Sequence, residues 1–257
     1  MSTVTVSGSN SQVFQLNYSS NDAAAYAQGL ADSIDAQIAA GALAVSNYAG
    51  GNVAPGPSGA AGGVVVFSTS ATTPGAVLVP NGNAAVVDNA AGPVSVWGGS
   101  TLKTVVAGSG GLSFYAATAP TSLLSIAAGD GANWIATATV GGGNYNINLG
   151  AGNDTVRIDT GNATVNMGTG QNTAQLGNGN STIISVGADL INGNSVAGGG
   201  GSDTIQVTSG QTTINPGSSN FTVYGNDSNP LTMLAGTGTD LVSIGIGGGT
   251  VTARVRW

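Results

Sequence analysis

Residues 149–184 read LGAGNDTVR, IDTGNATVN, MGTGQNTAQ and LGNGNSTII, four consecutive segments of nine residues each. Every segment has an apolar residue at its first and eighth places, glycine at its fourth and threonine at its seventh. A short fixed period of this kind indicates stacked structural repeats. Because side chains alternate between the two faces of a strand, the apolar places point inward while the glycine-rich half turns the chain. One segment cannot bury its own apolar face, so the segments must stack on one another.

The period extends beyond the quoted stretch. Gly143 continues the glycine column, and Ile147 continues the column of eighth places. The column of first places is predicted to contain Val140, Leu149, Ile158, Met167 and Leu176. These columns predict an all-β chain that forms a parallel β-solenoid or β-roll, with regular repeats at about 140–245. The usual preference for right-handed crossovers predicts a right-handed coil.

These segments resemble the RTX nonapeptide repeat, G-G-x-G-x-D-x-U-x, in which U is a large apolar residue. Residues 198–206 (GGGGSDTIQ) match every place, while residues 149–157 and 235–243 lack only the first glycine. The resemblance implies a parallel β-roll with two nonapeptides in each turn and Ca²⁺ between neighbouring loops. Calcium takes six to eight oxygen ligands, so the resemblance makes these residues candidate ligands: Asp154, Asn172, Asp203 and Asp240.

The sequence departs from the RTX pattern at the aspartate place. Successive segments carry Asp154, Ala163, Asn172 and Ser181 there. With two segments in each turn, Asp154 and Asn172 share one side of the coil, and the other side has no carboxylate. We therefore expect a largely metal-independent solenoid. Two roles stay open for the Asp and Asn side chains, which are calcium binding and hydrogen bonding to the backbone amides of turns.

The chain before the repeats divides into three parts. Residues 1–48 are predicted to form an N-terminal strand and a short helix, 49–63 a Gly/Pro-rich loop, and 64–257 the β-rich solenoid. Asn21 or Asp22 can cap the start of the helix. Its apolar stripe is predicted to contain Tyr26, Leu30, Ile34 and Ile38. We expect this helix to cap the open N-terminal end of the solenoid, because exposed strand edges need covering. Candidate strands within 64–140 fit either a sandwich or an irregular solenoid.

Charge and composition exclude several classes of protein. The 257 residues include 44 Gly, 11 acidic residues that are all Asp, and four basic residues, for a net charge of −7. A chain this acidic is not expected to bind nucleic acid. Without His or Cys it can form no zinc site or disulfide. We see no transmembrane run and no cleavable signal peptide. The RTX resemblance implies a secreted or cell-surface protein, exported by a bacterial type I route.

Three functional hypotheses follow. The first is an extracellular structural protein that self-assembles into a filament, surface layer or matrix, with assembly residues Arg254, Arg256 and Trp257 in an alternating C-terminal strand. The alternative is a calcium-dependent adhesin or a carbohydrate-binding module, in which tryptophans such as Trp97 and Trp134 stack on sugar rings. A polysaccharide-active enzyme would need clustered carboxylates near Arg157 or Lys103. The sequence predicts no catalytic residues, so we expect no enzyme.

Overall fold

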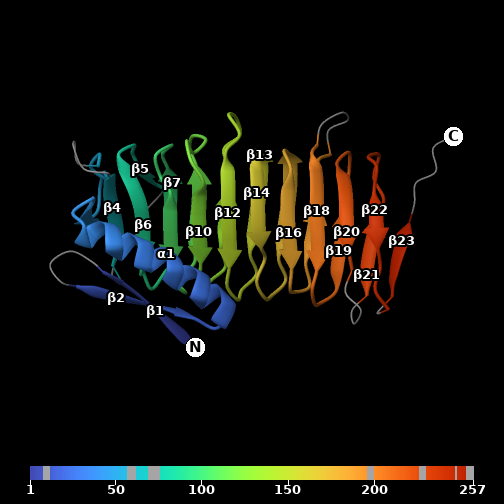
Figure 1. Cartoon of the computed structure of the whole chain (residues 1–257), viewed down its shortest axis with the longest axis horizontal. Coiled ribbons are helices and arrows are strands. Elements are labelled where there is room, and N and C mark those ends of the chain that lie inside the picture. The colour runs from blue at the N-terminus through green and yellow to red at the C-terminus, as the bar shows by residue number, and fades with distance from the viewer. Residues whose placement is uncertain are drawn as a thin grey trace.

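A computed structural model describes residues 1–7, 12–56, 62–68, 76–195, 200–225, 230–246 and 248–252. Within these ranges the chain forms one α-helix and 23 β-strands. Most strands stack side by side into an elongated parallel β-solenoid, and the helix lies near its N-terminal end (Figure 1). The predicted fold class is therefore confirmed.

The solenoid has two parallel sheets, and the chain passes from one to the other twice in each turn. In the described residues the first sheet has 11 strands: β3 (Leu43–Asn47), β4 (Gly62–Phe67), β6 (Asn83–Asp88), β8 (Thr104–Ala107), β10 (Leu124–Ala128), β12 (Asn144–Leu149), β14 (Asn162–Asn166), β16 (Ser181–Ser185), β18 (Ser202–Val207), β20 (Asn220–Tyr224) and β22 (Leu241–Ser243). The second has ten within the same ranges: β5 (Val77–Val79), β7 (Val94–Gly98), β9 (Leu112–Ala116), β11 (Trp134–Ala136), β13 (Thr155–Thr160), β15 (Thr173–Asn178), β17 (Leu190–Asn192), β19 (Thr212–Asn215), β21 (Leu231–Leu234) and β23 (Gly249–Thr252).

Two nonapeptides make one turn in the regular region. Thr155 pairs with Thr173 in the second sheet, and Thr164 pairs with Thr182 in the first. The column of eighth places, from Ile147 to Ile183, is buried between the sheets. The column of first places is also buried from Leu149 to Leu176. The prediction that Val140 begins this buried column is wrong. Val140 is 76 % exposed, because it lies in a bend before Gly141 and not in a strand.

The glycine column has a steric cause. Gly170 and Gly179 adopt positive φ angles of 133° and 140°. A Cβ atom on either glycine would overlap the carbonyl oxygen of its counterpart in the preceding turn, Gly152 or Gly161. Positive φ is readily available only to glycine, so both the backbone shape and the close stacking require this residue.

The region between 64 and 140, for which two architectures stayed open, belongs to the same solenoid. Its strands pair in parallel with the strands of neighbouring turns, from Val94↔Leu112 to Leu124↔Tyr145. The second pair is separated by more residues than the first, so turns of unequal length hide the period in the sequence. The first sheet begins before residue 64, since β3 already pairs with β4.

Helix α1 (Asn21–Ala39) begins one residue earlier than a cap at Asn21 predicts, because its cap is Ser20 and not Asn21 or Asp22. The Ser20 Oγ accepts a hydrogen bond from the backbone amide of Ala23 at 3.3 Å. Of the expected apolar stripe only Ile34 is fully buried, while Tyr26, Leu30 and Ile38 are partly buried. Small residues form most of the buried face instead: Ala23, Ala24, Ala27 and Ala31. Alanine lets the helix axis approach the sheet closely.

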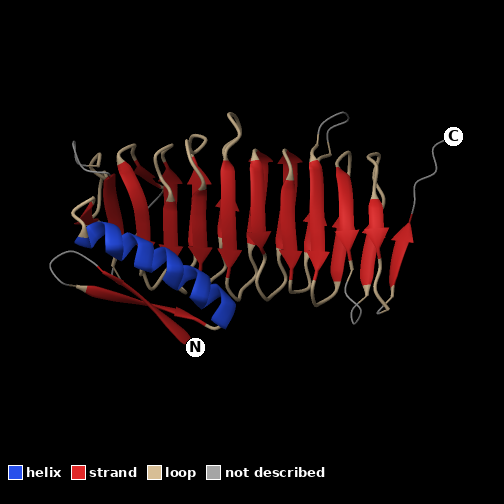
Figure 2. Cartoon of the chain, viewed as in Figure 1, coloured by secondary structure: helices blue, strands red, loops and turns tan. Residues whose placement is uncertain are grey.

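The helix does not cap the end of the solenoid as expected. It runs across the outer face of the first sheet, beside a hairpin of β1 (Ser2–Ser7) and β2 (Val13–Tyr18) (Figure 2). It contacts β3, β8, β10 and β12. The outward side chains of the early strands are apolar and pack with the helix in one buried cluster that includes Val66, Val87 and Val106. These residues must be covered, so the helix lies over a sheet face and not over a strand edge.

Candidate binding groove on the second sheet

Two of the candidate calcium ligands lie inside the coil in a ladder of hydrogen bonds. Asp154 Oδ1 accepts from the Asn133 backbone amide at 2.8 Å and from Asn133 Nδ2 at 2.9 Å. Asn172 Oδ1 accepts from the Asp154 backbone amide at 2.9 Å. Burial raises the pKa of Asp154 to about 6, since the carboxylate is shielded from water and Asp189 and Asp130 add negative charge nearby.

The other two candidates lie on the first-sheet side. Asp203 Oδ1 accepts from the Ser181 backbone amide at 2.9 Å, and burial raises the Asp203 pKa to about 6. Asp240 uses both carboxylate oxygens on backbone amides, those of Phe221 at 3.1 Å and Gly236 at 3.2 Å.

This set of side chains does not fit a calcium site. The structure places Asp154 and Asn172 together but Asp203 and Asp240 elsewhere. Each of the four side chains has an oxygen engaged by a backbone amide of the coil. Within the described ranges, no three His, Cys, Asp or Glu side chains gather closely enough to hold a metal ion. A calcium cage needs six or more converging oxygens.

The expected assembly residues Arg254, Arg256 and Trp257 lie outside the described residues. The described strands before them, and the turn between these strands, expose apolar side chains. Leu241 in β22 is 66 % exposed, Ile246 is 92 % exposed, and Val251 in β23 is 40 % exposed.

Three aromatic side chains gather on the outer face of the second sheet. Trp97 in β7 and Tyr115 in β9 are cross-strand partners, and Trp134 follows in β11. The ring centroids of Trp97 and Tyr115 are 6.1 Å apart, and those of Tyr115 and Trp134 are 4.3 Å apart. Trp97 is 47 % exposed and Tyr115 is 36 % exposed. We call these three residues the aromatic cluster. Core aromatics would be covered by other side chains, whereas these present ring area to the solvent.

An ion pair borders the aromatic cluster. Arg157 Nε lies 2.7 Å from Asp159 Oδ1. Both residues, the aromatic cluster and Thr137 line one hollow of about 300 Å³. The hollow therefore combines exposed rings with a fixed hydrogen-bonding pair whose charges offset each other.

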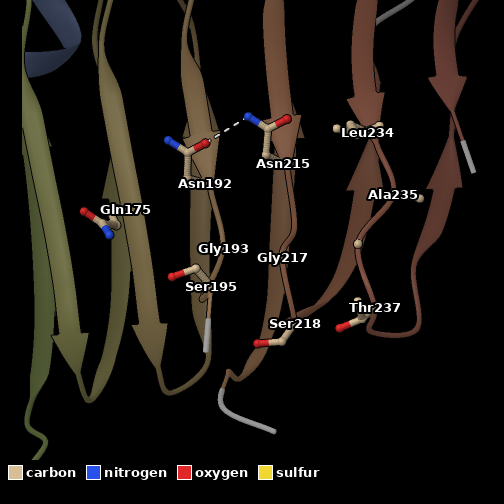
Figure 3. A pocket seen from close by; sticks show the side chains of 11 residues that line it. Gln175, Asn192, Gly193, Ser195, Asn215, Gly217, Ser218, Leu234, Ala235 and Thr237 are labelled. Atoms are coloured by element: carbon tan, nitrogen blue, oxygen red, sulfur yellow. Dashed lines mark hydrogen bonds between the residues drawn. The ribbon is translucent and has the colours of Figure 1, made fainter. Parts of the chain in front are cut away.

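Two further hollows continue from the first along the same side of the solenoid. A hollow of about 220 Å³ shares Arg157 and Asp159 with the first. It also shares Gln175 and Ser195 with a third, of about 630 Å³. The third is lined mainly by polar side chains and backbone from the second-sheet strands β15 to β21 and the loops that follow β17, β19 and β21 (Figure 3). We call the three together the groove.

Sequence reasoning identified two members of the groove, Trp97 and Trp134, as sugar-stacking candidates, and it singled out Arg157. It missed Tyr115 and the amide side chains. The signal was hidden because turns of unequal length separate residues that the sheet aligns. Among the described residues that line the three hollows, Asp159 carries the single carboxylate. Lys103 precedes β8 in the other sheet.

Fold and groove together define a class, a parallel β-solenoid with a grooved outer sheet face. Comparison of the chain with known protein families, with curated proteins and with solved structures finds no match. No helix in the part of the chain that the structure describes combines the length and hydropathy needed to cross a lipid bilayer.

Proposed function

We propose that this solenoid is a carbohydrate-binding surface protein without catalytic activity. The observation that carries the proposal is the aromatic cluster, whose exposed rings border the Arg157–Asp159 pair in one hollow. Aromatic faces pack against the C–H faces of sugar rings, and amide, hydroxyl or guanidinium groups bond the hydroxyls. A few well-placed polar groups in an apolar hollow are the usual composition of a ligand site.

Binding is better supported than hydrolysis. Glycoside hydrolases use two carboxyl groups on either side of the scissile bond. The lining of the groove, as far as the structure describes it, supplies one, and Arg157 already pairs with it.

The test is retardation of the protein in native gels that contain soluble polysaccharides. We expect retardation by at least one β-glucan, and a Kd about tenfold higher for Trp97→Ala or Tyr115→Ala, because losing a ring contact costs roughly 1.5 kcal/mol. The matched control is Tyr224→Ala, which removes a tyrosine that is 49 % exposed on the other sheet. Unchanged mobility in a full panel of neutral and acidic polysaccharides would exclude carbohydrate binding.

A second candidate function is self-assembly into a filament, surface layer or matrix. The exposed apolar residues Leu241, Ile246 and Val251 favour it. In the described residues, β22 and β23 each pair with a strand on one side only, and unpaired strand edges are templates for added strands. Negative-stain electron microscopy with and without a calcium chelator tests this function. Ordered fibres or sheets in both conditions support a polymer that needs no calcium, and single particles throughout exclude it.

We also propose kinship with RTX proteins, and with it secretion or surface location through type I export. Two nonapeptides in each turn and the glycine at the turn between them support this kinship. The repeats then keep the architecture of the calcium-binding kind, while hydrogen-bonded Asp and Asn side chains take the place of the ions.

A further inference from the structure

We infer that the groove binds a linear, uncharged, β-1,4-linked glycan that lies along the solenoid axis from Trp97 to Asn215. This inference rests on the proposed carbohydrate-binding function and deepens it. It adds the class of polymer, its direction and the residues that determine how long a chain is held.

The register of the second sheet supplies the direction. Trp97 pairs with Tyr115, Tyr115 with Ala136, and Ala136 with Arg157. The same row continues through the cross-strand pairs Arg157↔Gln175, Gln175↔Asn192 and Asn192↔Asn215. These seven residues form one straight row perpendicular to the strands. A ligand that follows the row crosses one strand after another and therefore runs parallel to the long axis of the molecule.

The row is long enough for an oligosaccharide. It crosses from β7 to β19, and strands in a sheet are about 4.8 Å apart, so its length is about 29 Å. The three hollows follow this row without interruption, because each shares lining residues with the next. A compact ligand would fill one hollow, whereas a linear chain would use all three.

The chemistry of the row changes along its length. At the β7 end the aromatic cluster offers ring faces. At the β19 end Asn215 Nδ2 donates to Asn192 Oδ1 at 2.9 Å, which fixes both amides (Figure 3). Among the described residues, the Asn192 Nδ2 group and the Asn215 Oδ1 atom make no further side-chain hydrogen bond, so both can bond a ligand. Gln175 is exposed and makes no side-chain hydrogen bond within the described part of the chain.

An extended peptide is a poorer match than a glycan. Where strands form the floor of the groove, their backbone amides and carbonyls already pair with both neighbouring strands. Where loops line it, backbone groups are also bonded between turns, as in the bonds from the Ser218 amide to the Asn194 carbonyl and from the Thr237 amide to the Gly217 carbonyl. A peptide therefore cannot add a strand there, and only side chains could form hydrogen bonds with its backbone amides. A glycan has no backbone amides to satisfy, and its hydroxyls match amide, hydroxyl and guanidinium groups.

The groove also selects against charged polymers. In the described lining, Arg157 is the single cation and its charge is offset by Asp159 at 2.7 Å. A polyanion gains affinity from clustered Lys and Arg, which this face does not supply. Among neutral polymers, a β-1,4-linked pyranose chain is flat, with C–H groups on its faces and hydroxyls on its edges. It can therefore stack on the aromatic cluster and reach the amides at the same time.

The experiment measures the affinity of the whole chain for cello-oligosaccharides from disaccharide to octasaccharide by calorimetry, with dextran as the α-linked comparison. We expect affinity to rise about tenfold or more between the disaccharide and the hexasaccharide, since each added hydrogen bond contributes roughly 0.5–1.5 kcal/mol. Dextran should bind at least tenfold more weakly.

Variants at the amide end locate the chain. Gln175→Ala and Asn215→Ala should weaken hexasaccharide binding roughly threefold to tenfold and leave disaccharide binding unchanged. The matched control is Gln206→Ala, which removes an exposed glutamine from the other sheet.

The outcomes separate the two proposals. Binding that depends on Trp97 but does not increase with chain length would overturn the axial site and leave carbohydrate binding standing. Equal affinity for dextran, or loss of binding in Gln206→Ala alone, would also overturn it. Absence of binding to every saccharide would overturn both proposals.

Discussion

At the scale of single residues, the side chain at the aspartate place of the repeat links one turn of the solenoid to the preceding turn. On the second-sheet side the side chains at this place are Asn133, Asp154, Asn172 and Asp189. In each case Oδ1 accepts the backbone amide of a residue in the preceding turn. A short side chain suits this bond, because its oxygen stays close to its own backbone. This explains why Asp and Asn, and not the longer Glu and Gln, occupy this place of the repeat.

Asn133→Ala should strongly destabilise the fold. Asn133 is 3 % exposed. Its Oδ1 accepts from Leu112, and its Nδ2 donates to the carbonyls of Gly129 and Gly131 and to Asp154. Removing it leaves buried polar groups unpaired, at roughly 1–3 kcal/mol each, so we expect a loss of about 2–4 kcal/mol in urea denaturation.

The control for that variant is Asn153→Ala. The exposed Asn153 also accepts one backbone amide, that of Gln171 at 3.0 Å. Water can replace this bond, so the loss should stay below about 1 kcal/mol. Equal losses in the two variants would show that burial of the ladder is not what makes it stabilising.

The buried carboxylates make stability depend on pH. Burial raises the pKa of Asp88 to about 7, and those of Asp154 and Asp203 to about 6, from an ordinary value of 3.8. The folded state therefore binds these protons more tightly than the unfolded chain does. The free energy of unfolding should be highest near pH 4 and should fall as pH rises to about 7.

Urea denaturation at pH 5 and pH 7.5 measures this effect. We expect the lower pH to give the higher stability, and we expect Asp154→Asn to reduce the difference because its amide does not titrate. Stability that is constant or rises over this interval would contradict the expected direction.

At the scale of elements, helix α1 and the first sheet depend on each other. Strands β4 and β6 are buried at every residue, since their inner faces point into the coil and their outer faces lie under cover. The cover is the alanine-rich face of the helix, together with the hairpin. Tyr18 in β2 fixes the hairpin to the solenoid through a hydrogen bond of 2.6 Å from its hydroxyl to the Ala107 carbonyl.

Ala27→Leu tests this packing. Ala27 is fully buried, so a larger side chain must push the helix away from the sheet. Overpacking of this kind typically costs roughly 1–3 kcal/mol, which thermal and urea unfolding would detect. Ala25→Leu, at an exposed place on the same helix, should change stability by less than about 0.5 kcal/mol. Similar behaviour of the two variants would mean that the helix packs loosely.

Much of the fold could be predicted from the sequence because a nine-residue period fixes both strand spacing and facing. The pairs Thr155–Thr173 and Thr164–Thr182 follow directly from two segments in each turn, the arrangement that the RTX resemblance implies. The position of the helix could not be predicted, since its amphipathic pattern says only that one face is buried. Val140 was misplaced because a periodic column does not tell where a strand ends.

The groove was predicted only in fragments for a related reason. Its members lie 18 residues apart between Arg157 and Gln175, but 23 apart between Asn192 and Asn215. A search for a fixed period finds residues at equal sequence separations, whereas the sheet aligns residues whose sequence separations differ. The aromatic cluster therefore becomes visible only after the turns are stacked.

At the scale of the whole molecule, the protein is a rod whose turns repeat one plan. The buried columns between the sheets stabilise the fold, so the outward side chains can differ between the two sheets. The helix and hairpin occupy the outer face of the first sheet near the N-terminus. The groove uses the outer face of the second sheet, so cover and binding surface do not compete for the same residues.

The in-register stacking of the second sheet turns the rod into a molecular ruler. One turn of the regular region corresponds to 18 codons, as the pair Thr155–Thr173 shows. Duplicating or deleting such a block would change the reach of the groove by one strand spacing, about 4.8 Å, and leave the neighbouring rungs unaltered. The length of polymer that the groove can hold therefore changes only by whole strand spacings. Selection could adjust it through slippage in a repetitive gene, without redesigning any single contact.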